Sequence, residues 1–578
     1  MQQLRWIFLA LLALSASANA LTKKPGDRVD NFRLLDQQGM SHELYYLSDM
    51  KAVVLMAHDT SCKASRESVA QLSQLRDQYK ARGVEVLMLD SSLNDTRDLI
   101  IEDAKKLNSS IPVLLDPLQL IGESLNANRA GEVLVVNPKD WTLAYRGPVK
   151  HAADALDATL AGASVKKASV RSKGCKVSMP ERNRERAHAK ISYEKTIAPM
   201  LVDNCVACHR QGGIGPWQMT SYDLVRGFAP MIREVVRTER MPPWHADPHF
   251  GTFSNNRSLS DDEVKALVHW IEAGAPRGKG TDPLTELKKS WPEWTMGEPD
   301  LVLEVPPFAV PATGSIPYQT PVIKNPLGRD IWMKAIDFSP SNRSVVHHIL
   351  GFASSAGANG LLQQLTASRS SLGVYVPGDV PHALPQDTGV FIPKDSDYVF
   401  QIHYTSNGKA TTEVTRIGIY FAKEPPKFPL RSTVLLDPRL KIPAQTKAHV
   451  ATATRTFQRD ALIYSLMPHA HMRGKAAQYT AHYPNGKEEV LLSVPKYDFN
   501  WQTTYEFATP KLLPKGTRLV YTTTYDNSPQ NKANPDPSIE VRWGEQTWQE
   551  MIYGDVRFRY LDETAEVETP KAKVSSTQ

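Results

Sequence analysis

The chain has 578 residues, of which 41% are hydrophobic and 22% are charged, and its formal net charge is +6. Such a length exceeds what one hydrophobic core can organise and predicts roughly three to five domains. The composition is that of a folded protein and excludes a disordered chain. The small net charge, without an array of basic and aromatic residues, gives no indication of nucleic-acid binding.

Residues 1–20 predict a secretory signal peptide. Arg5 precedes an apolar run at 6–14, and Ala18-Asn19-Ala20 forms a small-x-small cleavage pattern. The apolar run is too short to span a bilayer, and no later segment is long and apolar enough to do so. We therefore expect a mature protein, starting near Leu21, that is periplasmic or secreted and has no membrane span.

The first predicted domain covers residues 21–165 and has an α/β pattern. Short apolar strands are expected at 52–58, 84–89, 111–115 and 132–136. Between the first two strands, apolar residues recur at helical spacing: Val69, Leu72, Leu75 and Tyr79. Strand, helix and strand in this order favour a parallel sheet flanked by helices.

Cys62 follows the first of these strands, at the start of the helix, in the stretch Thr60-Ser61-Cys62-Lys63-Ala64-Ser65. This stretch and its surroundings resemble the thioredoxin and peroxiredoxin superfamily. The second cysteine of the family's C-x-x-C motif is replaced by Ser65, and Gly131 occupies the point of the proline that faces the motif. The resemblance implies a structural or docking domain, which the missing thiol favours, or a redox domain in which Cys175 resolves Cys62.

Residues 166–190 predict a basic linker. The segment is rich in Lys and Arg, lacks hydrophobic periodicity, and contains Gly174 and Pro180. A charge run of this kind is expected to be solvated rather than to bind a partner.

A haem attachment motif follows the linker. Cys205-Val206-Ala207-Cys208-His209 is C-x-x-C-H, in which two thiols reach the two vinyl groups of haem and the histidine binds the iron. The alternative is a disulfide or half of a zinc site followed by a chance histidine. The flanking segments 193–204, 222–240 and 260–273 are expected to be helices, the last with an N-cap at Ser260.

The segment 191–285 resembles an all-α class I cytochrome c domain of the variety with Met241-Pro242-Pro243-Trp244. The resemblance implies one haem c per chain and Met241 as the sixth iron ligand. Iron with Met and His ligands suits electron transfer. Other candidates for the sixth ligand remain open: Met219, Met231, His245 and His249.

Beyond residues 291–294 the chain predicts short strands, many prolines and few helices, which is an all-β pattern. Its length suits two sandwiches, at 298–425 and 426–562, before a polar tail at 563–578. Candidate metal ligands occur in two sets: His347, His348 and His403, then His469, His471 and Met551. Imidazole binds several transition metals, but a thioether favours copper over zinc.

These ligands, in this order, resemble the copper type II, ascorbate-dependent monooxygenase family, which includes peptidylglycine α-hydroxylating and dopamine β-monooxygenases. The shared motifs are HH-x-x-x-F from His347, the strand ending His403-Tyr404, the H-x-H of His469 and His471, and Glu550-Met551. The resemblance implies two jelly-roll sandwiches and two coppers per chain. The first set would hold the electron-transferring copper, and the second set would hold the catalytic copper at which O₂ reacts.

The chain also departs from that family. It has no cysteine in this region, whereas the animal enzymes are stapled by disulfides there. Met467 stands where the peptide-amidating enzyme has a substrate-binding arginine, and Asp555 stands where it has a tyrosine. Peptidyl-glycine is therefore not the expected substrate.

Together these features predict a multidomain protein that hydroxylates a C–H bond of a small organic substrate with O₂. Two coppers would store the electrons, and the fused haem would relay them from an external donor, ascorbate or a periplasmic redox protein. Two alternatives stay open: a non-catalytic periplasmic copper and haem protein for electron transfer or copper binding, and a thiol redox protein with added domains.

Overall fold

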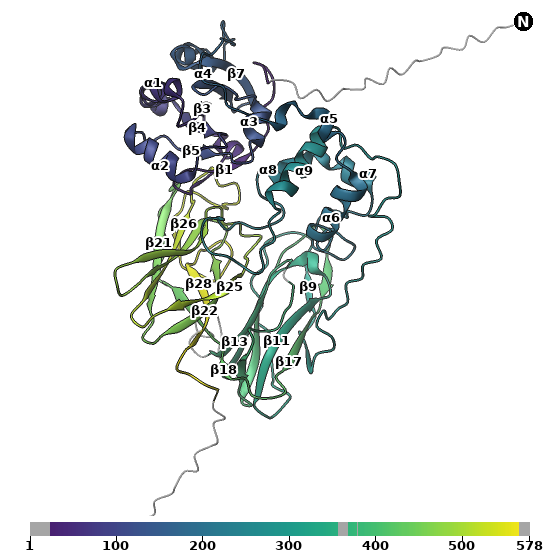
Figure 1. The fold of residues 1–578 in the computed structure, drawn as a ribbon. Coiled ribbons are helices and arrows are strands. Elements are labelled where there is room, and N and C mark those ends of the chain that lie inside the picture. The colour runs from purple at the N-terminus through teal and green to yellow at the C-terminus, as the bar shows by residue number, and fades with distance from the viewer. Residues whose placement is uncertain (1–22, 356–367, 379, 566–578) are drawn as a thin grey trace, which may run out of the picture.

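The structure, a computed structural model, describes residues 23–355, 368–378 and 380–565. The predicted signal peptide and most of the predicted polar tail lie outside the described residues. The protein is multidomain, with an α/β domain at the N-terminus, a helical segment and a large β-rich region (Figure 1). None of the helices within the described ranges has the length and apolarity needed to cross a membrane.

The N-terminal domain has a five-stranded sheet in the order β5-β4-β3-β6-β7. The strands are β3 (Ala52–His58), β4 (Val84–Asp90), β5 (Val113–Leu115), β6 (Glu132–Asn137) and β7 (Thr142–Pro148). The first three are parallel, as predicted, but β6 is antiparallel to β3. The prediction of a parallel sheet was wrong for this part, because β6 runs antiparallel to β3 and a tight turn then joins β6 to an antiparallel β7.

Both faces of this sheet are covered because alternate residues of β3 point to opposite sides. Ala52, Val54 and Met56 pack with helices α1 (Lys63–Tyr79) and α4 (Ala152–Leu160). On the other face, Val53 and Leu55 pack with residues near the hairpin β1 (Arg33–Leu35) and β2 (Ser41–Glu43). The predicted apolar face of α1 is buried. Two further helices complete the domain: α2 (Arg97–Lys106) and α3 (Leu120–Leu125).

The helical segment contains α5 (Glu185–His188), a π-helix (Tyr193–Ile197), α6 (Ala198–Asn204), α7 (Tyr222–Gly227), α8 (Ala229–Arg237) and α9 (Asp261–Glu272). The helix predicted over 222–240 is interrupted at Phe228, because Pro230 has no N–H to continue the hydrogen-bond ladder. Helix α9 begins at the predicted cap, where Ser260 and Glu263 form a capping box.

Residues 241–257, between α8 and α9, leave the helices and pack on the β-rich region. The Trp244 ring lies 4.9 Å from that of Tyr505, and the backbone N–H of Ser254 donates to the carbonyl of Glu506 at 2.8 Å. Phe253 forms a β-bridge with Phe507. A separate all-α cytochrome c domain is therefore not evident over 191–285, because this arm joins the helices to the β-rich region.

The β-rich region contains two units, each made of two sheets that share one core. In the first unit the sheets have the orders β10-β15-β12-β13 and β18-β14-β11-β17-β8. Its strands are β8 (Leu301–Glu304), β9 (Phe308–Val310), β10 (Val322–Ile323), β11 (Ile331–Pro340), β12 (Val346–Ser355), β13 (Ser368–Tyr375), β14 (Thr388–Ile392), β15 (Ser396–Tyr404), β16 (Thr411–Glu413), β17 (Thr415–Phe421) and β18 (Phe428–Pro429).

In the second unit the sheets have the orders β19-β28-β22-β25 and β21-β26-β23-β24. Its strands are β19 (Arg431–Leu436), β20 (Lys441–Ile442), β21 (His449–Thr456), β22 (Ala461–His469), β23 (Gly474–His482), β24 (Glu488–Val494), β25 (Tyr505–Leu513), β26 (Arg518–Tyr525), β27 (Val541–Arg542) and β28 (Tyr553–Tyr560). The two units meet at a small apolar cluster that includes Leu350 and Phe352 from the first and Met467, Met551 and Tyr553 from the second.

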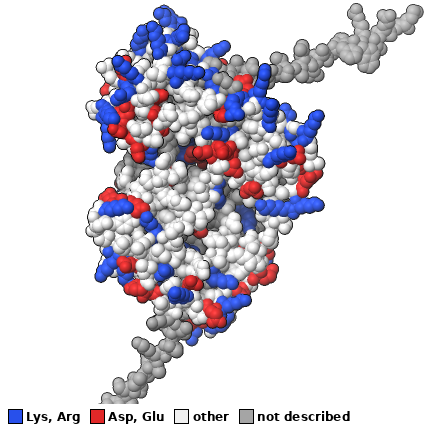
Figure 2. All heavy atoms as spheres, in the orientation of Figure 1, with Lys and Arg blue, Asp and Glu red and all other residues white. Residues whose placement is uncertain are grey.

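The N-terminal domain lies against the second unit and is held there by polar contacts. Lys496 pairs with Glu43 at 2.7 Å, and Arg97 pairs with Asp247, in the arm, at 3.0 Å. On the face drawn in Figure 2, charged side chains gather over the N-terminal domain, and a broad uncharged surface covers the middle of the molecule.

Candidate functional site

The first histidine set lies on two neighbouring strands of the first β unit. His348 on β12 is paired with His403 on β15, and a β-bulge lies between Val346 and His348. Successive residues of a regular strand point to opposite faces, but a bulge inserts an extra residue and re-aims its side chain. The bulge therefore allows the adjacent His347 and His348 to face the same site.

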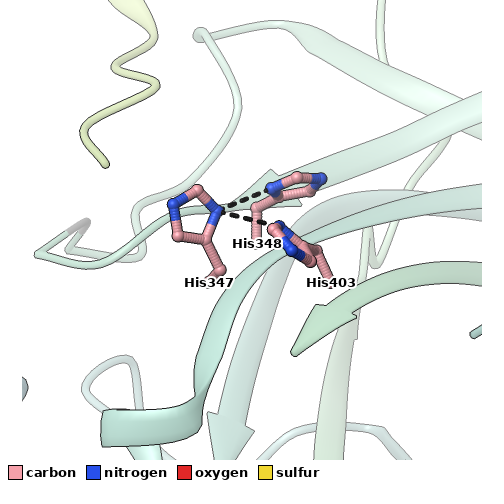
Figure 3. A group of neighbouring side chains, drawn as sticks. All are labelled: His347, His348 and His403. Carbon is pink, nitrogen blue, oxygen red and sulfur yellow. Dashed lines mark hydrogen bonds between the residues drawn. The ribbon is translucent and has the colours of Figure 1, made fainter. Parts of the chain in front are cut away.

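The three rings of this set converge through their Nδ1 atoms (Figure 3). Nδ1 of His347 lies 3.1 Å from Nδ1 of His348 and 3.2 Å from Nδ1 of His403. Burial lowers the pKa of His347 to about 3 and that of His403 to about 2, and it lowers the pKa of His348 well below its ordinary value. These rings are therefore neutral near pH 7, with one nitrogen lone pair each.

The second set lies at the end of β22. The Nδ1–H of His469 faces the side-chain oxygen of Gln502 at 2.8 Å, and Nδ1 of His471 lies 3.2 Å from the carbonyl of Gln549. Such contacts select the tautomer in which Nδ1 carries the proton and leave Nε2 as the ligand atom. Burial lowers the pKa of His469 to about 4, so this ring is also neutral near pH 7.

Glu550 connects Met551 to the second set. Its carboxyl oxygens accept the backbone N–H of His471 at 2.8 Å and that of Arg473 at 2.6 Å. Burial is the main cause that raises the pKa of Glu550, to about 7. Met551 is 1% exposed and lies in the apolar cluster between the two β units. The backbone N–H groups of His471 and Met551 both lie at Oε2 of Glu550, at 2.8 and 3.3 Å, so this carboxyl joins the two segments that carry the predicted ligands.

The two sets form one contiguous group. The ring centroids of His348 and His469 are 5.8 Å apart. Tyr318 lies against both sets, with ring centroids 4.7 Å from His403 and 6.2 Å from His471. Phe499 stacks on His347 with centroids 4.6 Å apart. We call His347, His348, His403, His469 and His471 the histidine cluster.

The histidine cluster fits a soft, redox-active metal. Nε2 of His471, which is left as the ligand atom of that ring, is buried and has no hydrogen-bond partner. A buried polar atom without a partner is costly, and a metal ion removes that cost for a lone pair directed at it. Five neutral imidazoles with a neighbouring thioether are the donors that copper accepts in both oxidation states.

The predicted haem attachment residues form a compact turn after α6. The backbone N–H groups of Cys208 and His209 both donate to the carbonyl of Cys205, at 3.1 and 3.0 Å. Neither cysteine belongs to a disulfide, and burial raises the pKa of Cys205 to about 12. Nδ1 of His209 lies 3.0 Å from the carbonyl of Trp217, which leaves Nε2 as the ligand atom. These residues fit covalent haem attachment with an axial histidine.

The candidates for a sixth iron ligand lie in different surroundings. Met241 is half-buried at the start of the arm, before a cis peptide bond to Pro242. His245 is 4% exposed, and its Nε2 has no hydrogen-bond partner. Met219 is 5% exposed, whereas Met231 is 52% exposed on α8. His249 lies 2.7 Å from Asp247. Met241 as the sixth ligand stays a prediction.

Cys208, of the predicted haem attachment motif, lies near a segment that contacts the histidine cluster. A Cβ built on Gly378 would lie 3.5 Å from Sγ of Cys208 and 3.9 Å from Cζ3 of Trp501. Trp501 belongs to the segment 498–503, which also supplies Gln502 to His469 and Phe499 to His347. One short segment therefore contacts both sets of histidines and reaches the haem attachment turn. No sequence pattern predicted that Phe499, Trp501 and Gln502 would contact the histidine cluster or lie near the C-x-x-C-H turn.

The remaining thiols form a disulfide between Cys62, at the N-cap of α1, and Cys175 in the linker. The linker pairs with the chain beside Cys62, because the N–H of Ala130 donates to Cys175 and that of Val177 donates to Asn128, each at 3.0 Å. Cys175 is therefore the partner of Cys62, which is the pairing that the sequence analysis named.

Comparison with known proteins identifies the N-terminal domain. Residues 25–152 match the model of the AhpC/TSA family, and this part of the chain is a thioredoxin-like domain of that kind. Comparison with curated proteins gives no match.

Several solved structures are similar to this chain. A hypothetical protein from Sinorhizobium meliloti 1021 is 20% identical, with 28% of this chain and 95% of that chain covered and a TM-score of 0.25. Peroxidoxin BcpB from Mycobacterium tuberculosis is 19% identical, with 24% and 97% covered and a TM-score of 0.21. A secreted disulfide oxidoreductase from Mycobacterium tuberculosis is 14% identical, with 22% and 95% covered and a TM-score of 0.20.

Proposed function

We propose that this protein is an exported copper-dependent monooxygenase that hydroxylates a C–H bond of a small organic substrate. The observation that carries the proposal is the histidine cluster, in which a set of three converging Nδ1 atoms lies beside a pair of Nε2 atoms. His347, His348 and His403 would hold one copper. His469, His471 and Met551 would hold the copper at which O₂ reacts.

The chain's own residues bind and orient these ligands. Gln502 and the carbonyl of Gln549 fix the ring orientations of His469 and His471. Glu550 fixes the backbone of His471 and Arg473 relative to Met551. Residues that hold metal ligands in this way raise metal affinity and set geometry.

The surroundings of the histidine cluster exclude water. His348 and His471 are 1% and 0% exposed, and Tyr318 and Phe499 pack against the rings. Exclusion of water suits chemistry with O₂, because it prevents the loss of reactive species to side reactions. When bound, copper supplies one-electron storage and O₂ activation, and haem supplies one-electron transfer.

The overall reaction needs an external donor. One C–H bond, one O₂, two electrons and two protons give one C–OH group and one water. Ascorbate or a periplasmic redox protein would supply the two electrons one at a time through the haem. The short connection from Cys208 past Gly378 to Trp501 and Gln502 supports this route.

Ascorbate-driven O₂ consumption by the copper- and haem-loaded protein tests the proposal without knowledge of the substrate. We expect consumption, with hydrogen peroxide formed when no substrate is present, and its loss in His469→Ala and Met551→Ile. The haem absorption spectrum should be unchanged in both variants. Equal consumption in the wild type and both variants would remove the assignment of the second site.

A non-catalytic electron-transfer or copper-binding protein is the second candidate. The separation of 5.8 Å between the His348 and His469 rings, with Tyr318 and Phe499 beside them, favours it because little space is left for a substrate. Such a protein would bind copper and exchange electrons with haem but would not consume O₂ with ascorbate. The O₂ assay therefore separates the two candidates.

A further inference from the structure

A second group of metal-binding side chains lies far along the chain from the histidine cluster. Glu181 and His188 belong to the linker, His269 belongs to α9, and Glu123 belongs to α3 of the thioredoxin-like domain. Three separate parts of the fold thus meet at this point. The sequence predicted that this part of the linker would be merely solvated.

The two imidazoles of this group are stacked. Their centroids are 4.0 Å apart and their planes differ by 5°. Nε2 of His188 lies 3.1 Å from Glu181, and Nε2 of His269 lies 3.0 Å from Glu123. One ring nitrogen from each histidine and one carboxylate oxygen of Glu181 all lie within 4.8 Å of one another.

Burial and charge at this point favour a cation. The side chains of His269, Glu123 and His188 are 6%, 9% and 13% exposed, and that of Glu181 is 31% exposed. Two carboxylates therefore face two stacked imidazoles with little access to water. Arg184 pairs with the other oxygen of Glu181 at 2.6 Å, and Arg182 interacts electrostatically with Glu123. Buried carboxylates are usually paired or bound to a metal ion, so two of them beside two imidazoles form a suitable set of ligands for a cation.

We propose that His188, His269 and Glu181 form a site for a divalent cation of the zinc class. Imidazole nitrogen and carboxylate oxygen are ligands of zinc, which takes four ligands, so three from the protein leave one for water. Glu123 holds His269 in place, as carboxylates commonly do behind metal-binding histidines.

The proposed site would clamp the linker and α9 to the thioredoxin-like domain. It lacks a sulfur ligand, which distinguishes it chemically from the set that contains Met551. It is independent of the proposed oxygenase function, because none of its residues belongs to the histidine cluster or to the haem attachment turn.

Cobalt(II) is a suitable probe because it enters zinc sites and absorbs visible light there. The full-length protein is first given only the two equivalents of copper expected for the histidine cluster, added as copper(I), and is then titrated with cobalt and with zinc by equilibrium dialysis. The variants are His188→Gln, His269→Gln, Glu181→Gln and Glu123→Gln. The matched control is His482→Gln, since His482 contacts Glu488 at 2.7 Å on β23 without a second histidine.

We expect the wild type and His482→Gln to bind one cobalt beyond the copper, and His188→Gln, His269→Gln and Glu181→Gln to lose it. Glu123→Gln should weaken binding by about 10- to 100-fold. The proposal would be overturned if the wild type bound no cobalt beyond the copper, or if His188→Gln bound as much cobalt as the wild type. The group would then consist only of two hydrogen-bonded pairs, His188 with Glu181 and His269 with Glu123. If His269→Gln fails to fold, the more exposed Glu181→Gln decides.

Discussion

At the residue scale, the histidine cluster depends on a few side chains that contact its members without being ligands themselves. Gln502 and Glu550 are buried, and each binds the ring or the backbone of a histidine in the second set. The bulge at His347 has the same effect for the first set. The ligand types alone would not make a site without these contacts.

The two ligand sets can be separated by metal content. Because His403 supplies one of three converging Nδ1 atoms, His403→Ala should lower copper from two equivalents to one, with the haem iron unchanged. Elemental analysis of the purified variant and its copper electron paramagnetic resonance spectrum would measure this. His482→Ala, a half-buried histidine outside the cluster, is the control and should keep both coppers.

Asp116 gives a pH-dependent contribution to stability. Burial raises its pKa to about 6 in the folded protein from an ordinary value of 3.8. Because the folded protein holds the proton of Asp116 more tightly than the unfolded chain does, protonated Asp116 stabilises the fold. This stabilisation is complete below pH 3.8 and is lost as the pH rises through about 6. The loss is about 3 kcal/mol for a shift of about two pKa units.

Asp116→Asn should remove this part of the pH dependence, because an amide does not ionise. Hydrogen exchange of residues 84–125 at pH 4 to 7, corrected for the intrinsic exchange rate, measures local stability there. The wild type should lose protection over this range more steeply than the variant. Parallel profiles for the two proteins would show that Asp116 does not titrate as described.

The sequence supplied the ligand candidates of the histidine cluster and of the C-x-x-C-H turn, but neither the group of Glu181, His188 and His269 nor the contacts that orient the cluster. Paired histidines, H-x-H and C-x-x-C-H are local patterns, so they can be read from neighbouring positions. Gln502 is 33 positions from His469, and Glu550 is 79 positions from His471. Contacts over such separations depend on how the strands pair, which local patterns do not encode.

At the element scale, the segment 498–503 connects the haem attachment turn with the histidine cluster. Trp501→Leu should slow electron transfer from haem to copper several-fold, because it removes the aromatic group beside Gly378 and Cys208. Laser-flash photoreduction of the haem by an external photosensitiser, with copper oxidised, would measure the rate. Trp332→Leu, on β11, is the matched control and should keep the wild-type rate.

The disulfide between Cys62 and Cys175 ties the linker to the thioredoxin-like domain across 113 positions. Closing so long a loop restricts the unfolded chain, and its removal should cost about 2 to 5 kcal/mol. Cys175→Ser should therefore lower the thermal midpoint, and reductant should lower that of the wild type but not that of the variant. A midpoint in the wild type that does not respond to reductant would contradict this role.

Prediction of the elements succeeded where packing follows local periodicity. Val69, Leu72, Leu75 and Tyr79 are buried on α1 as expected. The break at Phe228 follows from Pro230, which the sequence already contained. The position of the arm at 241–257 could not be predicted. Trp244 and Phe253 were expected to pack within the helical segment, whereas they pack in the core of the second β unit.

At the scale of the whole molecule, three parts of the chain contact the second β unit. The thioredoxin-like domain lies on it through Lys496 and Glu43, the arm pairs with β25, and the first β unit shares the apolar cluster with it. This arrangement places a haem attachment turn and a histidine cluster near one segment of chain. We expect the purified protein to contain two coppers and one haem iron per chain.

The central claim is that electrons pass from the haem to copper in the histidine cluster. In an anaerobic stopped-flow experiment, the copper(II)-loaded protein is mixed with less than one equivalent of a reductant that reaches the haem first. In the loaded protein we expect the ferrous haem bands to appear and then decay while the copper(II) signal is lost. In the copper-free protein the ferrous haem bands should persist. Ferrous haem that persists beside copper(II) in the loaded protein would contradict this claim.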